Sequence, residues 1–146
     1  MIVIHDSAVR DSIRARIGAL TPKARARWGR MSVDQMLWHC NQVLKTSLGE
    51  IKVPLRRPPV PVAMLKFMLF YLPWPHGAPT APEYQAGVRH DFEDERAQCL
   101  ELIGRVSGRS MDDGEWSRAV FGTISGREWS CLHARHLDHH LKQFGA

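Results

Sequence analysis

Apolar residues recur every three or four positions along four long stretches of the chain, as they do on the buried face of an amphipathic helix. Almost no stretch shows the alternation of apolar and polar residues that is typical of strands. The spacing therefore predicts an all-α protein, with the architecture of a four-helix bundle. The predicted helices run from Asp6 or Ser7 to about Gly18, from Ser32 to Gly49, from Tyr84 or Val88 to Val106, and from Gly126 to about Phe144.

Two of these helices begin with the pattern of a capping box. Ser32 is followed three positions later by Gln35, and Ser125 is followed in the same way by Glu128. In such a box the two side chains satisfy backbone N–H groups that the first helical turn leaves free. The dipeptide Thr21-Pro22 is also a helix-start signal, and it predicts a further short turn of helix.

Eight of the nine prolines lie between Pro54 and Pro82, in the connection between the second and third long helices. They flank the apolar segment Val62 to Leu72, which predicts a short helix closed by Pro73 and Pro75. We call residues 54–82 the Pro-rich excursion. Two interpretations of it stay open: a connection wrapped over the core, or a pocket wall or dimer surface.

The composition changes this picture little, because a hydrophobic fraction of 44% and a charged fraction of 24% are ordinary for a globular protein. We expect one domain over residues 1–146. No basic region precedes a long apolar run at the start, and no apolar stretch reaches the about 20 residues of a membrane span. Cys40, Cys99 and Cys131 are odd in number and far apart, which favours free thiols in a cytoplasmic protein.

The formal net charge of +5 raises the question of nucleic-acid binding. Seven basic residues and only Asp11 as an acid lie between Arg10 and Arg30, but no recognition motif accompanies them. We therefore expect no nucleic-acid partner. The basic surface can equally attract an anionic small substrate or cofactor.

Histidine is concentrated near the end of the chain, where four of the eight histidines fall within residues 133–140. Side chains three or four positions apart meet on a helix, so His136 can pair with His133, His139 or His140. Spacing does not choose among these three companions. Because metal sites of the catalytic zinc type use three protein ligands, a third must come from another helix. His39 stands out, since it lies at the edge of the apolar face of the second helix.

The segment HLDHHLKQ resembles the last-helix signature H-x-x-H-H-x-x-Q of the DinB/YfiT-like superfamily of metalloenzymes. The segment MSVDQMLWHC is similar to the second-helix segment of the same superfamily, in which a single histidine ends an apolar run. WGRMSVDQMLWH and SGREWSCLHARHLDHHLKQFG together are especially similar to a branch known as a domain of unknown function. The resemblance covers nearly the whole chain in order and length, although its motifs are confined to two helices.

Carried over position by position, the resemblance implies metal ligation by His39, His136 and His140, with His139 as a neighbour that is not a ligand. Gln143 matches the closing glutamine of the motif. The superfamily often has an arginine directly after the last ligand, where this chain has Leu141. Further pocket or supporting residues are His133, Trp38 and Trp129.

The resemblance implies a DinB-like four-helix bundle, expected to be a homodimer, that acts on a small-molecule substrate. It also implies a divalent metal ion, for which nickel, zinc, iron and manganese all accept imidazole ligands. The reactions it suggests are thiol-dependent transfer or isomerisation, with a low-molecular-weight thiol as cofactor, or hydrolysis. The alternative is a non-catalytic helical bundle that binds a metal or a small ligand.

Overall fold

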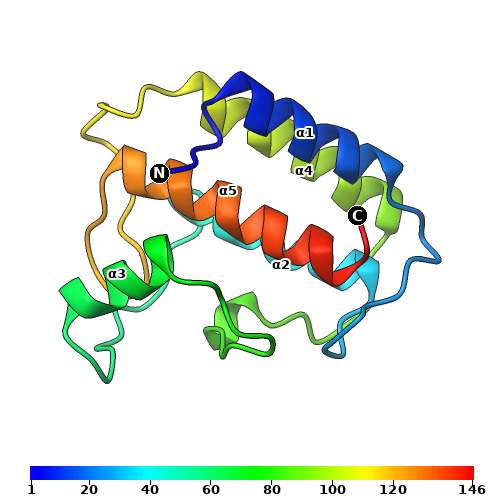
Figure 1. The fold of residues 1–146 in the computed structure, drawn as a ribbon, viewed down its shortest axis with the longest axis horizontal. Coiled ribbons are helices and arrows are strands. Elements are labelled where there is room, and N and C mark those ends of the chain that lie inside the picture. Colours follow the sequence, from blue (N-terminus) through cyan, green and yellow to red (C-terminus); the bar gives the residue numbers. More distant parts are fainter.

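The computed structural model describes residues 1–146 and confirms that the protein is all-α (Figure 1). The helices are α1 Ser7–Ala19, α2 Val33–Ser47, α3 Val62–Tyr71, α4 Phe92–Gly108 and α5 Gly126–Gln143, with a short 3₁₀ turn, η1, at Pro82–Tyr84. No strand forms, and the only β-type pairing is an isolated bridge between Ala119 and Gly122.

The helix ends follow the local sequence signals. At the start of α1 the Asp6 carboxylate accepts hydrogen bonds from the amides of Ala8 and Val9, so Asp6 is the capping residue. The predicted capping boxes both form, and in that of α5 the side chains of Ser125 and Glu128 each bond the other's amide. These signals are local in sequence, which is why they predict the boundaries well.

The short turn expected at Thr21-Pro22 is present, and one predicted helix boundary is wrong. Thr21-Pro22 starts only a single turn, because the backbone that follows bonds elsewhere: the Arg27 amide donates to the Gln143 carbonyl over 2.7 Å. The helix expected from Tyr84 or Val88 begins instead at Phe92, where Asp91 caps it by accepting from the Asp94 amide. Tyr84 belongs to η1, which packs against α2.

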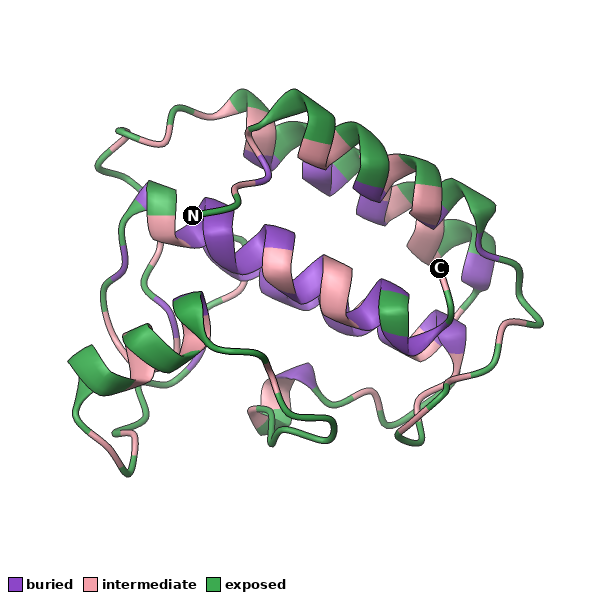
Figure 2. Cartoon of the chain, in the orientation of Figure 1, coloured by how far each residue is buried: buried purple, intermediate pink, exposed green.

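The core lies between the long helices. α2 packs mainly on α4, α1 contacts both α4 and α5, and α5 also packs on α2. Figure 2 shows the buried positions facing inward and an almost fully buried path along α2 and α5. These two helices therefore form the centre of the molecule, and polar side chains on their facing sides are removed from water.

The Pro-rich excursion lies along one side of this core. Its helix α3 packs against α5, and η1 packs against α2. Phe70 of α3 and Tyr84, just beyond the excursion, are buried, whereas most of α3 is exposed. The excursion, together with η1, thus covers the outer faces of the two helices that carry the candidate ligands.

None of the helices has both the length and the apolar character that crossing a bilayer requires.

Candidate metal centre

Three histidines converge between α2 and α5. His39 comes from α2, and His136 and His140 come from successive turns of α5. The three side chains are buried, with 5%, 8% and 8% of their surface exposed. One ring nitrogen of each lies within 4.8 Å of those of the other two, which is close enough for the group to hold a metal ion. We call these residues the histidine triad.

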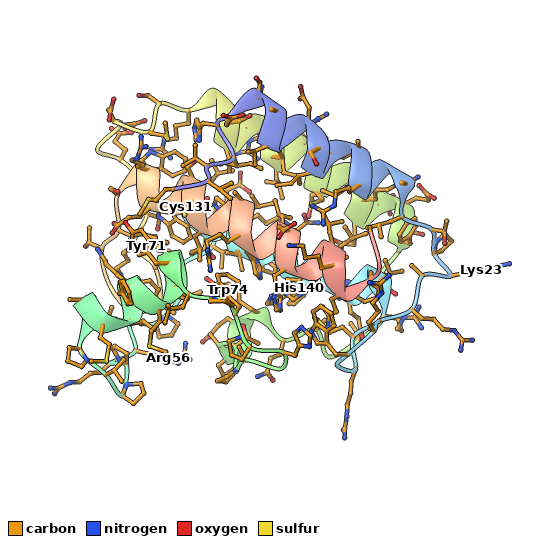
Figure 3. All side chains as sticks on the ribbon, in the orientation of Figure 1. Lys23, Arg56, Tyr71, Trp74, Cys131 and His140 are labelled. Carbon is orange, nitrogen blue, oxygen red and sulfur yellow. The ribbon has the colours of Figure 1, made fainter.

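The helices explain this convergence. His136 and His140 are four residues apart, so they share one face of α5, and that face is turned toward α2. The Nε2 atoms of His39 and His136 are 2.9 Å apart, and the three rings are 4.7–4.9 Å apart between centroids. Figure 3 labels His140 in the C-terminal half of α5 and Trp74 in the segment that follows α3.

Hydrogen bonds to the protein orient two of the three rings. The Nδ1–H of His39 donates to the backbone carbonyl of Tyr84 over 2.7 Å. The Nδ1–H of His140 donates to the Oε1 atom of Gln143 over the same distance. Because Nδ1 carries the proton in both rings, each Nε2 has a lone pair rather than a proton, as a ligand imidazole requires, and that of His39 faces Nε2 of His136. This arrangement also fixes ring orientation, as supporting residues do in metal sites.

Gln143 is itself held in place by the loop after α1. Its Nε2 atom donates to the backbone carbonyl of Trp28 over 2.8 Å, which leaves Oε1 directed at His140. The neighbouring Gly29 has a positive φ of 78°, and a Cβ atom there would lie 2.8 Å from the Gln143 amide nitrogen. The close approach therefore requires glycine at this position.

Burial keeps the triad uncharged near neutral pH. Loss of hydration lowers the pKa of His39. The pKa of His136 lies well below its ordinary value, chiefly because this ring is also buried and further because His140 and His39 are close to it. The pKa of His140 falls to about 3 for the same reason, with His39 adding to the effect. Three neutral imidazoles whose nitrogen atoms converge form a donor set that suits zinc, nickel, iron or manganese.

The other predicted site residues lie outside the triad. His133 is buried one turn earlier on α5, where its Nε2 atom bonds the Ser47 hydroxyl and its ring stacks on Trp129. Trp38 is half-buried and stacks on His90. Spacing had left His133, His139 and His140 open as companions of His136, and the structure brings only His140 into the ligand group.

Carboxylates and thiols do not join the group. Asp34 pairs with Arg89 and Asp138 pairs with Arg16, and neither carboxylate bonds an imidazole of the triad. The three cysteines are free and buried, and none belongs to the cluster. Among the histidine, cysteine, aspartate and glutamate side chains, only histidine ring nitrogens are therefore placed to ligate an ion in the triad.

Two contacts of the triad have no signal in the sequence pattern. The Tyr84 carbonyl is a backbone group, so no side-chain motif can predict it. Trp74, in the Pro-rich excursion, lies 6.0 Å from His136 and 5.6 Å from His139 between ring centroids. The excursion thus forms part of the surroundings of the triad.

Comparison with known proteins adds no relative: no family model, curated protein or solved structure matches the chain. The superfamily resemblance consequently rests on the sequence motifs alone, and the function has to be inferred from the geometry of the triad.

Proposed function

We propose that the protein is a divalent-metal-dependent enzyme in which His39, His136 and His140 hold the ion. The observation that carries the proposal is the convergence of three buried, uncharged imidazoles within 4.8 Å. Polar groups are costly to bury unless they are partnered. In the structure the Nε2 atoms of His39 and His136 partner each other over 2.9 Å, whereas an ion would be shared by all three imidazoles; three protein ligands leave a position open for substrate or water.

The triad supports a limited set of reactions. A bound divalent ion lowers the pKa of a water molecule or a thiol bound to it, which supplies a nucleophile near neutral pH. The proposed activity is thiol-dependent transfer or isomerisation of a small-molecule substrate, or its hydrolysis. The chain's own thiols are poor candidates for the nucleophile, because Cys40, Cys99 and Cys131 are buried and burial raises the pKa of each.

The same proposal includes the DinB-like four-helix bundle, formed by α1, α2, α4 and α5. Its support is the packing of these four helices on one another and the match of the triad to the histidines of the two motifs. A homodimer and a cytoplasmic location belong to this proposal as properties that the resemblance implies.

A second candidate is a protein that binds metal without turnover. The burial of the triad favours it, since none of the three residues is more than 8% exposed and Trp74 packs near His136. An enzyme needs a ligand position that an added molecule can reach, whereas a storage or structural site does not. The two candidates therefore differ in the accessibility of the bound ion.

Metal content is the decisive measurement. We expect about one divalent ion per chain in protein purified without a chelator or a histidine tag, and loss of that ion in His39→Ala and in His136→Ala. His139→Ala is the matched control, because this histidine is adjacent to His140 and is expected to leave the ion in place. Circular dichroism verifies that each variant is folded. Failure to bind an ion after reconstitution near pH 8, where imidazoles are neutral, would contradict the proposal.

Cobalt(II) substitution then separates the two candidates. We expect the visible spectrum of the cobalt protein to change when a small thiol such as N-acetylcysteine is added, because the thiolate would enter an open position. An unchanged spectrum at saturating thiol would favour the non-catalytic candidate.

A further inference from the structure

A cavity of about 750 Å³ adjoins the triad between α1, α5 and the segment that follows α3. Trp74 and His139 line the cavity and also contact the triad, at 6.0 Å from His136 and 5.3 Å from His140 between ring centroids. A molecule in the cavity would therefore lie against residues that pack directly on the candidate ligands.

One wall of the cavity is aromatic. His139 is packed among three other rings, those of Trp28, Trp74 and His76, at 5.6, 5.6 and 6.3 Å. Trp28 and His76 are stacked 3.7 Å apart and nearly parallel. We call these four residues the aromatic cluster. Aromatic faces and edges attract a further planar ring in stacked or edge-on arrangements.

The cavity also carries an excess of positive charge. Three cationic side chains and one carboxylate line it, a net charge of +2 with the histidines neutral. Asp138 already pairs with Arg16 and Lys142. Arg135 pairs with no carboxylate. It donates a hydrogen bond to the Leu72 carbonyl, and its Nε atom has no partner in the protein. Its guanidinium group lies 5.7 Å from the ring centroid of Trp74.

We propose that this cavity binds a planar aromatic monoanion, such as an aromatic carboxylate. The ring would pack on the aromatic cluster, and the carboxylate would accept hydrogen bonds from Arg135, whose planar guanidinium suits a carboxylate. Assigning this ligand as the substrate of the enzyme depends on the proposed function. Binding itself does not, because none of the triad residues lines the cavity.

Calorimetric titration of the whole protein tests the proposal with naphthalene-2-carboxylate and its neutral analogue naphthalen-2-ylmethanol. We expect saturable one-to-one binding of the carboxylate, at least about tenfold tighter than that of the alcohol, because hydrogen bonds to a charged group are involved. Arg135→Gln should remove that preference. Arg127→Gln, which alters an exposed arginine of the same helix, should retain it. Trp28→Leu should weaken both probes, since it removes one ring but not the carbonyl that holds Gln143.

Equal binding of the two probes, or equal losses in Arg135→Gln and Arg127→Gln, would overturn the proposal, as would no binding at all. The titration is repeated with metal-free protein and with His39→Ala. Carboxylate binding that persists in both would uphold the cavity even if the triad proves to hold no ion. An ion in the triad without carboxylate binding would overturn the cavity alone.

Discussion

His39 and His136 are 97 positions apart in the chain, yet their Nε2 atoms lie 2.9 Å from each other. The contact joins α2 to α5, so the candidate metal centre and the packing of the two central helices depend on the same residues. A bound ion would be expected to raise the stability of the fold, since anything that binds only the native state does so. We expect the melting temperature to rise with added zinc in the wild type but not in His136→Ala, as measured by calorimetry.

Gln143 should control the affinity of the triad for metal. Gln143→Leu removes the acceptor for the Nδ1–H of His140, and loss of such a supporting hydrogen bond typically weakens metal binding about 10–100-fold. Competition with a chromogenic chelator measures the change. Gln143→Glu retains an acceptor and should recover much of the affinity, whereas Lys142→Gln, an exposed neighbour, should have no effect. An unchanged affinity in Gln143→Leu would show that the hydrogen bond does not support ligation.

Gly29→Ala should destabilise the protein by about 1–2 kcal/mol, because an L-residue at a φ of 78° is strained. The new methyl group would also displace the Gln143 amide, so metal binding should weaken in the same variant. Gly18→Ala is the control, because Gly18 lies in α1 and a Cβ atom there would meet nothing within 4 Å. This change should stabilise the helix by about 0.5–1 kcal/mol. Urea unfolding compares the two, and equal effects would refute the local explanation.

Acid should destabilise the metal-free protein through its buried histidines. Burial, with His5 nearby, lowers the pKa of His133 to about 3, against 6.5 when unfolded. The unfolded chain therefore binds more protons between these two values, and the free energy of unfolding falls as the pH falls through that window. One such group contributes up to about 1.4 kcal/mol per pH unit there, and nothing above the window.

Urea unfolding at several pH values between about 7 and about 5 measures this dependence. His133→Gln keeps a polar partner for Ser47 but cannot take up a proton, so its slope should be shallower by the equivalent of one proton. Identical slopes in the variant and the wild type would mean that the pKa of His133 is the same in the folded and unfolded states.

The cysteines should be inert in the native protein. Cys40, Cys99 and Cys131 are at most 1% exposed, and burial raises the pKa of Cys99 to about 12, with Glu95 adding to the effect. A thiol reagent such as Ellman's reagent should therefore find no reactive group until the protein is unfolded, and then three. Rapid reaction of one native thiol would reopen a covalent role for that cysteine.

The exposed apolar side of α3 is the candidate surface for the expected homodimer. Phe67 is 54% exposed and Met64 is 52% exposed, although both are strongly hydrophobic. If this surface pairs two copies, Phe67→Ser should shift the mass measured by light scattering from dimer to monomer. Lys52→Ser, a change at an exposed polar position outside α3, is the control. A monomeric wild-type protein would contradict the expectation.

Much of the fold could be predicted from the sequence because its signals are local. Apolar spacing indicated the long helices, and the capping boxes at Ser32 and Ser125 placed two of their starts correctly. The start of α4 was missed because Tyr84 is held by tertiary contacts: its hydroxyl bonds Thr46, and its carbonyl accepts from His39. Local propensity carries no information about such distant partners.

The site was predictable only in part for the same reason. Helical spacing identified His136 and left three companions open, the apolar face of the second helix singled out His39, and it was the resemblance that pointed to His140. The contacts of Trp74 and the unpaired charge of Arg135 depend on how the Pro-rich excursion folds back onto α5. The spacing of apolar residues within the excursion does not indicate that it folds back onto α5.

The two hydrogen bonds that orient the triad differ in how they would withstand mutation. At position 84 the acceptor for His39 belongs to the main chain, so the bond depends on the backbone path, which the buried Tyr84 side chain holds through its hydrogen bond to Thr46. At position 143 the acceptor is a side-chain amide, and most replacements would lose it. The Pro-rich excursion, which ends before Tyr84, could therefore diversify in sequence, and with it the shape of the adjoining cavity, while the histidines keep their orientation.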